Sequence, residues 1–433
     1  MKSKSKNSKW DSDESEDDNQ SIPKSDNQPN VEEISNEQLN APANDVNEES
    51  NTEPLHKKFK SETDLTVKYE EASISSVSPK RVIEIVEEVE EKCTNVEKSS
   101  ERAHNPIFDG CRSVECYQRL NFIDQGTYGM VFRARCKNTN EIYALKQVKL
   151  GAEANKVGFP VTALREINIL LALQHPNIVR VREMVVGSSI DKVYMVMEYC
   201  ENDLKTCMKL SKQPFSTAEV KQLMMQLLSA MEHMHSKWYI HRDLKTSNLL
   251  YNNKGFLSVC DFGLARKYGS PIAAYTAPVV TLWYRAPELL LGSRLYSIPI
   301  DMWSVGCIFA EMLQSGEPLL PGEGEADQIS KIFKLLGAPN EQRWPGFSSL
   351  PNVSKISLKM PTKSKLRDLI PMTSFSGGAC LSDCGMDLLS QLLNMDPAKR
   401  ISAKLALQHG WLKKELPCPT PLDMMPTFKS RHE

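Results

Sequence analysis

The sequence lacks any apolar run of the roughly 18–20 residues that crossing a bilayer requires. Its first nine residues are rich in lysine and serine without an apolar core, so they do not resemble a secretory signal. Its 11 cysteines are odd in number and irregularly spaced, which argues against a disulfide framework, and the nearest pairs have no convincing zinc-ligand partners. These absences predict a protein that works away from membranes in a reducing compartment, the cytosol or the nucleus.

The first part of the chain is poor in aromatic residues and rich in Ser, Asn, Asp and Glu. Its first hundred residues carry an acidic excess of about 11, although the whole chain has a net charge of only −2. Such a segment buries too little apolar surface to offset chain entropy, so we predict an acidic, Ser-rich, disordered arm at residues 1–112. A basic cluster at 56–60 is a candidate nuclear-import signal, with an ordinary solvated cluster as the alternative.

From residue 117 the hydrophobic pattern becomes that of a folded domain. Short β-rich runs are expected as strands at 117–123, 130–135, 142–148 and 193–199. The stretch 161–173 reads as a helix in which Ile167, Leu170 and Leu173 form one buried stripe. Beyond Leu204 the chain reads mainly helical, for example at 217–235 and 299–313. We therefore predict an α+β fold with a small antiparallel β-rich lobe (117–199), a larger helical lobe (200–411) and a C-terminal tail (412–433).

The first predicted strand ends in a glycine-rich turn, Asp124-Gln-Gly-Thr-Tyr-Gly129. Glycines let backbone N–H groups approach phosphates, but an ordinary hairpin turn has a similar sequence. A later strand contains Lys146, whose ammonium group is costly to bury alone. Its expected partners are nucleotide phosphates and Glu166, and the alternative is a strand-edge lysine that reaches solvent.

Three further motifs follow in order: His241-Arg-Asp-Leu-Lys-Thr-Ser-Asn248, Asp261-Phe-Gly263 and Ala286-Pro-Glu288. Together with the glycine-rich turn and Lys146, they resemble the protein kinases over residues 117–411. The resemblance implies the two-lobed kinase fold, in which one regulatory helix accompanies the β-rich lobe, and transfer of the γ-phosphoryl group of ATP.

The resemblance also assigns roles to the motif positions. Asp243 is expected to accept the proton of the attacking hydroxyl, and Lys245 to steady the γ-phosphate. Lys146 and Glu166 complete the catalytic set, and Asn248 and Asp261 offer oxygen ligands for Mg²⁺. Two structural roles are also implied: Asp301 braces the catalytic loop, and Glu288 pairs with Arg400.

The nucleotide pocket that the resemblance implies involves the glycine-rich turn, the strands around it, the hinge and the metal ligands. The expected residues are Ile123, Asp124, Gln125, Gly126, Thr127, Tyr128, Gly129, Val131, Ala144, Lys146, Met197, Glu198, Cys200, Asp203, Asn248, Leu250 and Asp261. Cys260 should line the floor of this pocket. It is either a small buried hydrophobe or, if Lys146 lowers the pKa of its thiol, a reactive site.

Residues 160–166, Pro-Val-Thr-Ala-Leu-Arg-Glu, resemble the signature helix of the cyclin-dependent kinases. In that family a cyclin swings this helix into place, so Leu164 is interpreted as a cyclin contact, with a core leucine as the alternative. Thr276 then matches the activating phosphosite, and a phosphate there needs guanidinium partners. The matching positions are Arg165, Arg242 and Arg266.

Two more features follow from this resemblance. Val279, Val280 and Arg285 match a pocket that favours proline after the target Ser or Thr, because proline has no N–H to leave unsatisfied. Thr127 and Tyr128 match sites of inhibitory phosphorylation, where a phosphate would repel ATP.

Within this family the sequence is most similar to the PITSLRE kinases, with the PISSLRE kinases as the alternative. The resemblance implies an L-type cyclin partner, protein substrates with Ser/Thr-Pro sites, and work in nuclear transcription, pre-mRNA splicing or cell-cycle control, with the cytoplasm as a second location. A pseudokinase scaffold is a competing class, but Lys146, Asp243, Asn248 and Asp261 are all present. We expect no direct nucleic-acid binding, since the acidic arm would repel a phosphate backbone.

Overall fold

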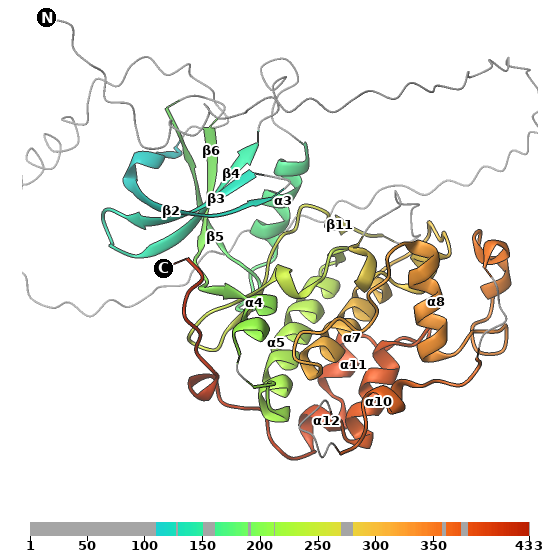
Figure 1. The fold of residues 1–433 in the computed structure, drawn as a ribbon. Coiled ribbons are helices and arrows are strands. Elements are labelled where there is room, and N and C mark those ends of the chain that lie inside the picture. Colours follow the sequence, from blue (N-terminus) through green and yellow to red (C-terminus); the bar gives the residue numbers. More distant parts are fainter. Residues whose placement is uncertain are drawn as a thin grey trace, which may run out of the picture. The chain divides into compact units, whose positions relative to one another are not determined.

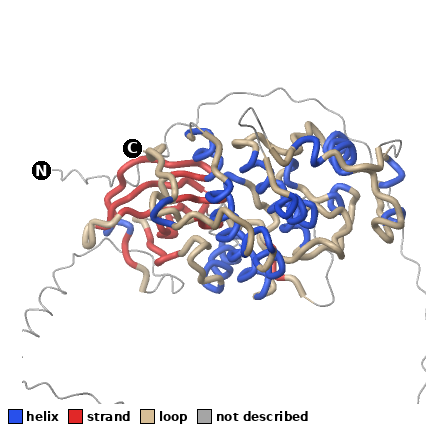
Figure 2. Tube along the Cα trace, turned by 90° about the horizontal axis from the view of Figure 1, so that it is seen from below, coloured by secondary structure: helices blue, strands red, loops and turns tan. Residues whose placement is uncertain are grey.

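The computed structural model describes residues 110–126, 129–149, 161–188, 192–211, 213–269, 280–356, 361–373 and 380–432. Four residues with predicted roles, Thr127, Tyr128, Thr276 and Val279, lie outside these ranges, as does the predicted arm up to residue 109. Figure 1 shows a β-rich lobe next to a larger helical lobe, and Figure 2 shows most strands gathered at one side of the fold. The predicted α+β architecture with a β-rich and a helical lobe is confirmed.

A six-stranded sheet in the order β1-β5-β6-β4-β3-β2 forms the small lobe. Its strands are β1 (Arg112–Ser113), β2 (Tyr117–Gly126), β3 (Gly129–Cys136), β4 (Ile142–Lys149), β5 (Val181–Val186) and β6 (Lys192–Glu198). All neighbours are antiparallel except β1, which runs parallel to β5. Because β1 is part of the sheet, the sheet begins a few residues before residue 117, the predicted start of the domain. The side chains of Arg112 and Glu183 form an ion pair beside the contact between β1 and β5.

One helix, α3 (Val161–Ala172), belongs to the β-rich lobe. Leu170 and Leu173 are buried, with 4 % and 1 % exposure, and Ile167 packs against a cluster formed by Val148, Val193 and Met195. The predicted apolar stripe is therefore present, and it fixes the face that α3 turns toward the sheet. Glu166 lies on the same helix and is thereby directed toward β4.

The helical lobe is organised around α5 and α7. Its helices are α4 (Leu204–Leu210), α5 (Thr217–Ser236), α6 (Pro287–Leu290), α7 (Pro299–Leu313), α8 (Glu325–Leu336), α9 (Leu366–Leu369), α10 (Asp383–Leu392), α11 (Ala403–Leu407) and α12 (Gly410–Lys413). Helix α5 begins with a capping box, in which Ser216 and Glu219 satisfy each other's backbone N–H groups. Helix α7 is buried along almost its whole length, as expected of a helix with little polar surface.

Short strands position the loops between the lobes. They are β7 (Asn202–Asp203), β9 (Leu249–Tyr251) and β10 (Leu257–Val259) in one small sheet, and β8 (Tyr239–Ile240) and β11 (Arg266–Lys267) in another. The segment 241–248 connects β8 to β9, and residues 260–265 connect β10 to β11. The two motif loops are in contact, because the backbone N–H of Cys260 donates to the carbonyl oxygen of Asn248 at 3.0 Å. Across the described ranges, no helix combines the length and apolarity that crossing a membrane requires.

Candidate active site

Lys146 and Glu166 form a closed ion pair between β4 and α3. The Lys146 Nζ lies 2.7 Å from the Glu166 Oε1, and the two side chains are 13 % and 5 % exposed. Burial alone would lower the pKa of Lys146, but the charges of Glu166 and Asp261 outweigh it and raise that pKa above its ordinary value. The lysine is thus a buried cation with a carboxylate partner, and the alternative of a solvent-reaching strand-edge lysine is wrong.

The carboxylate of Asp243 is held by donors on three sides. Its Oδ2 accepts hydrogen bonds from Lys245 Nζ at 2.9 Å and Asn248 Nδ2 at 3.2 Å. Its Oδ1 accepts from the backbone N–H of Thr281 at 3.1 Å and from the Thr281 hydroxyl at 2.9 Å. These bonds fix the direction of the carboxylate, which is what a residue that orients a hydroxyl nucleophile needs.

Asp301, on α7, holds the backbone that carries Asp243. Its two oxygens accept the backbone N–H groups of His241 and Arg242, at 2.9 and 3.0 Å, and its Oδ2 lies 2.9 Å from His235 Nε2. Burial alone would raise the pKa of Asp301, but the hydrogen bond and charge of His235 and the Arg242 N–H outweigh it and keep that pKa below its usual range. The predicted bracing contact is therefore present.

The predicted pair between Glu288 and Arg400 is also present. The Arg400 guanidinium donates to both carboxylate oxygens of Glu288, at 2.7 and 2.9 Å, in the two-point geometry typical of strong pairs. The Arg400 side chain is 0 % exposed, so this is a structural link inside the helical lobe.

The structure fits a magnesium site at Asp261 and Asn248. Asp261 has φ of 61°, and its Oδ1 is buried without a hydrogen-bond partner in the protein, as a carboxylate kept for an external ligand would be. Asn248 uses its Nδ2 on Asp243, which turns its Oδ1 away from that residue. Two oxygen donors suit Mg²⁺, which completes its octahedron with water and phosphate oxygens.

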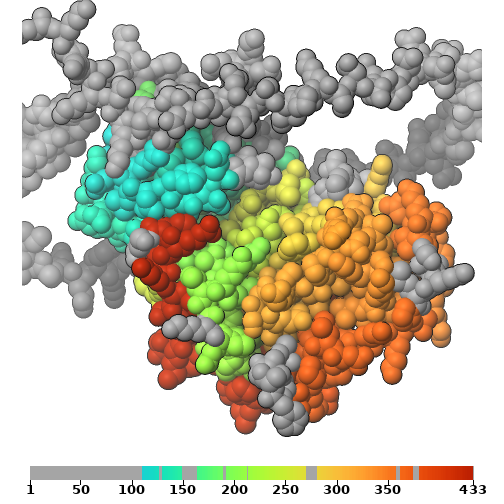
Figure 3. Space-filling view, viewed as in Figure 1, coloured from blue at the N-terminus to red at the C-terminus, as the bar shows by residue number. Residues whose placement is uncertain are grey.

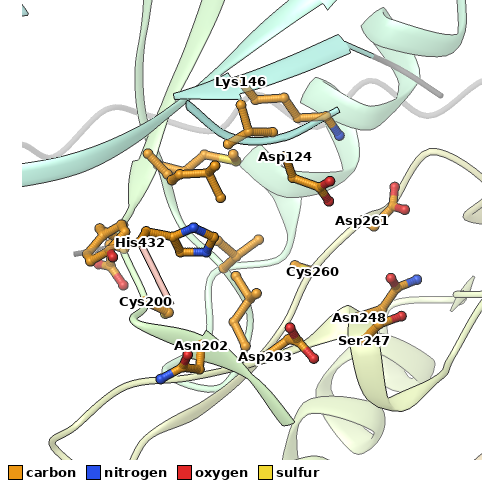
Figure 4. A pocket seen from close by; sticks show the side chains of 18 of the residues that line it. Asp124, Lys146, Cys200, Asn202, Asp203, Ser247, Asn248, Cys260, Asp261 and His432 are labelled. Atoms are coloured by element: carbon orange, nitrogen blue, oxygen red, sulfur yellow. The ribbon is translucent and has the colours of Figure 1, made fainter. Parts of the chain in front are cut away.

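Lys146, Glu166, Asn248 and Asp261 line one pocket between the lobes, with a cavity volume of 240 Å³ (Figure 4). The predicted pocket residues found in its wall are Ile123, Asp124, Gly129, Val131, Ala144, Lys146, Glu166, Met197, Glu198, Cys200, Asp203, Asn248, Leu250 and Asp261. Gln125 is exposed and is not among the residues of the wall. Gly126 pairs with Gly129 at the end of the hairpin, and nothing is described of Thr127 and Tyr128.

Cys260 lines the pocket, as expected, but its environment does not favour a thiolate. Burial, together with the charge of Asp261, raises the pKa of the Cys260 thiol far above its ordinary value, although Lys146 acts in the opposite direction. This favours the interpretation of Cys260 as a small buried hydrophobe over that of a thiol activated by Lys146.

Val280 and Arg285, the two described residues of the predicted proline pocket, are in contact with each other. Val280 has φ of 72°, which is rare for a β-branched residue and indicates a backbone held in place by its surroundings. The Arg285 guanidinium donates to the Val280 carbonyl oxygen and pairs with Glu325. Thr281 then follows directly and bonds Asp243, so one short segment connects the predicted proline pocket to the catalytic loop.

The three arginines assigned to a phosphothreonine are only partly brought together. Arg242 donates from Nε to the carbonyl of Leu264 at 2.7 Å, and Arg266 donates to the next carbonyl, that of Ala265, at 2.8 Å. These two arginines are therefore neighbours. Arg165 lies on α3 directly before Glu166, and Thr276 lies outside the described residues.

Leu164 is 38 % exposed on α3, so it is not a core leucine. Leu171, seven residues later on the same helix, is 55 % exposed. Residues seven apart lie on the same face of a helix, so the two leucines form an apolar stripe that faces away from the sheet.

Several residues of the site were missed by the sequence reasoning. Thr281 directly follows Val280 of the predicted proline pocket, but nothing in the sequence indicates that it bonds Asp243. Leu170, Val179 and Ser247 line the pocket as well, and so does His432, near the end of the C-terminal tail.

Comparisons with known proteins agree with this geometry. The model of the protein kinase domain matches residues 117–412. Cyclin-dependent kinase G-2 of Oryza sativa subsp. indica is 57 % identical over 327 residues, which cover 76 % of this chain and 45 % of the relative. The human cyclin-dependent kinase 11B is 54 % identical over 328 residues, 76 % of this chain and 40 % of the relative. The rat cyclin-dependent kinase 11B is also 54 % identical over 328 residues, which cover 76 % of this chain and 73 % of the relative. The chain thus spans less than half the length of the first two relatives.

Proposed function

The chain belongs to the protein kinase family and, within it, to the cyclin-dependent kinases of the PITSLRE type, and from that premise we propose that it phosphorylates Ser or Thr followed by Pro. The observation that carries the proposal is the convergence of Lys146, Asn248 and Asp261 on one pocket, where Asn248 also bonds the carboxylate of Asp243 at 3.2 Å. A pseudokinase scaffold lacks at least one of these groups, and the PISSLRE alternative is disfavoured by the similarity to kinases 11B and G-2.

The geometry supports an in-line transfer of the phosphoryl group. The Asp243 carboxylate accepts the proton of the substrate hydroxyl while that oxygen forms a bond to the γ-phosphorus of ATP and the bond to the β,γ-bridging oxygen breaks, releasing ADP. Lys245, 2.9 Å from Asp243, supplies positive charge where the transferred group is most anionic. Lys146, fixed by Glu166, holds the α- and β-phosphates, and Mg²⁺ bound at Asn248 and Asp261 would neutralise the phosphate charge.

The preference for proline has a physical basis in the Val280 carbonyl. Arg285 already occupies this acceptor, so a substrate backbone N–H at the next position would find no partner there. Proline has no N–H and avoids that loss.

We further propose that a cyclin, of the L type, binds the stripe of Leu164 and Leu171 and thereby stabilises the closed Lys146–Glu166 pair. Phosphorylation of Thr276, with Arg165, Arg242 and Arg266 as partners, and inhibitory phosphorylation of Thr127 and Tyr128 remain part of the proposal. Nuclear work in transcription, splicing or the cell cycle is proposed from the relatives.

A radiolabel transfer assay tests the activity directly. Wild type and Asp243→Asn are assayed on a Ser-Pro peptide and on the matched Ser-Ala peptide, with and without an L-type cyclin. Cyclin-stimulated labelling of the Ser-Pro peptide is expected, and the variant should lose about 10²–10⁴-fold of the rate. ATP binding without transfer under every cyclin tested would instead support the scaffold.

A further inference from the structure

The C-terminal tail segment, residues 414–432, connects the two lobes. It leaves α12, follows α5 and reaches the β-rich lobe; in Figure 3 its atoms, in red, meet those of the β-rich lobe, in cyan. The fully buried Lys221 of α5 donates from Nζ to the carbonyls of Glu415 at 2.7 Å and Pro417 at 3.0 Å. A buried ammonium group needs such partners, so the start of the segment is part of the helical lobe.

Three asparagine side chains form hydrogen bonds with the backbone of residues 428–432. One lies in the helical lobe, one next to the hinge and one in the β-rich lobe. Asn253 exchanges two hydrogen bonds with Phe428 (3.0 and 2.8 Å), Asn202 bonds the Lys429 carbonyl (3.1 Å) and the Arg431 N–H (3.2 Å), and Asn121 donates to the His432 carbonyl (3.0 Å). Asn202 is only 3 % exposed, so its bonds to the segment satisfy an amide that has little access to water. The segment is therefore a fixed element from the helical lobe through the hinge to β2.

This path places His432 in the wall of the nucleotide pocket. Figure 4 shows its imidazole on the same side of the pocket as Cys200, while the charged ends of Lys146 and Asp261 lie on the opposite side. Burial and the neighbouring Arg431 lower the pKa of His432, although the carboxylates of Asp124 and Asp203 act in the opposite direction. The imidazole is thus neutral at pH 7 and offers one donor and one acceptor.

We propose that His432 is a nucleotide-binding residue, whose imidazole contacts the ribose of the bound nucleotide while the tail segment forms a fixed wall of the pocket. The ribose is the expected neighbour because the hinge takes the base and Lys146 takes the phosphates. With the segment in place the pocket still has a cavity volume of 240 Å³, and Lys146 and Asp261 still line it. The segment therefore forms part of the wall and does not fill the pocket. The proposal rests on the proposed function only in requiring that a nucleotide binds here.

Direct binding of ADP to the full-length chain, measured by calorimetry, tests the proposal. His432→Ala is expected to raise the Kd about threefold to tenfold, the range of one hydrogen bond. The matched control is Met424→Ala on the same segment, since Met424 is 71 % exposed; its Kd should equal that of wild type. An unchanged Kd in His432→Ala overturns the proposal, and tighter binding overturns it in favour of a segment that competes with the nucleotide.

A second variant separates the imidazole from general packing. Asn121→Ala removes the bond that fixes the His432 backbone but leaves the imidazole, so it should weaken ADP binding less than His432→Ala. In the double variant it should add nothing further, because the contact it positions is already gone. Additive losses would mean that His432 acts independently of its placement by the segment. The same measurements stand if the chain transfers no phosphate, so failure of the proposed function and failure of this proposal are distinguishable.

Discussion

Arg285 donates two hydrogen bonds to the carbonyl oxygen of Val280, from Nη2 at 2.9 Å and from Nε at 3.3 Å. The same guanidinium reaches Glu325 with its Nη1 at 2.5 Å. The backbone at Val280 has φ of 72°, a conformation that costs about 1–3 kcal/mol and persists only where its surroundings impose it. Arg285 supplies part of that restraint.

Replacing Arg285 with Ala should relax the preference for proline. The freed Val280 carbonyl can accept a substrate N–H, so the kcat/KM ratio of Ser-Pro over Ser-Ala peptides should fall about fivefold to tenfold, the value of one hydrogen bond. Glu325→Gln is the matched control, because it removes the ion pair of Arg285 but keeps both bonds to Val280; its ratio should match wild type. A loss of equal size on both peptides would show that Arg285 acts on activity and not on selectivity.

Asp301→Asn should destabilise the helical lobe and weaken catalysis together. The change removes a buried charge that accepts two backbone N–H groups and pairs with His235, a loss of about 3–5 kcal/mol in the free energy of unfolding. Urea unfolding at pH 7 measures it. The control, Asp327→Asn, breaks a partly exposed pair with Lys331 and should leave the unfolding midpoint unchanged.

The pH dependence of the Asp301 effect follows from the direction of its pKa shift. Because the folded pKa lies below the unfolded value of about 4, the stabilisation is complete above that value and is lost as the pH falls through the folded pKa. The stability difference between wild type and Asp301→Asn should therefore be constant from neutral pH down to about pH 5 and shrink below pH 4. A difference that grows toward acid pH would contradict this assignment.

Much of the site was predictable because kinase motifs place their functional groups close together in sequence. Asp243, Lys245 and Asn248 lie within six residues and bond one another in the structure. Lys146 and Glu166 are 20 residues apart, but each stands in a strongly patterned element, so their meeting could be expected. The fold class followed from the same patterns, although β5 was missed because Arg182 and Glu183 interrupt its apolar alternation.

The rest depends on contacts between residues far apart in the chain, which leave no local pattern. The Asn121 amide donates to the His432 carbonyl, 311 positions away in the sequence, and no sequence pattern near either residue predicts this contact. Thr281 meets Asp243 across 38 positions through a loop whose course depends on Val280. Cys260 shows the reverse problem: its place beside Asp261 was clear, but the burial that raises the pKa of its thiol depends on the whole pocket.

A pair of histidines should make stability fall in mildly acidic solution. The rings of His175 and His233 lie 5.1 Å apart, and burial lowers the pKa of each, with the charge of the other acting further on His175. Below about pH 6.5 the unfolded chain therefore binds protons that the folded one does not, and the free energy of unfolding decreases as the pH falls. Urea unfolding between pH 7.5 and 5.5 should show a smaller decrease in His233→Gln than in wild type; equal decreases would remove the pair as the cause.

Gly129 should tolerate no side chain at the end of the β2–β3 hairpin. Its φ is +146°, and an added Cβ would lie 1.7 Å from the carbonyl oxygen of Gln147, a backbone atom of β4 that cannot move without breaking the sheet. Gly129→Ala must therefore shift the hairpin away from the strand that carries Lys146, and the pocket wall formed by Gly129 and Val131 moves with it. We expect the KM for ATP to rise about tenfold or more, since a misplacement of one ångström is costly at a reacting site.

Gly324→Ala is the control, because a Cβ at Gly324 meets nothing within 4 Å. Steady-state kinetics and thermal melting of both variants test this prediction. A lowered melting temperature with an unchanged KM for ATP would show that Gly129 stabilises the sheet but does not affect nucleotide binding. A raised KM for ATP in Gly129→Ala would show that nucleotide binding requires the close approach of β3 to β4.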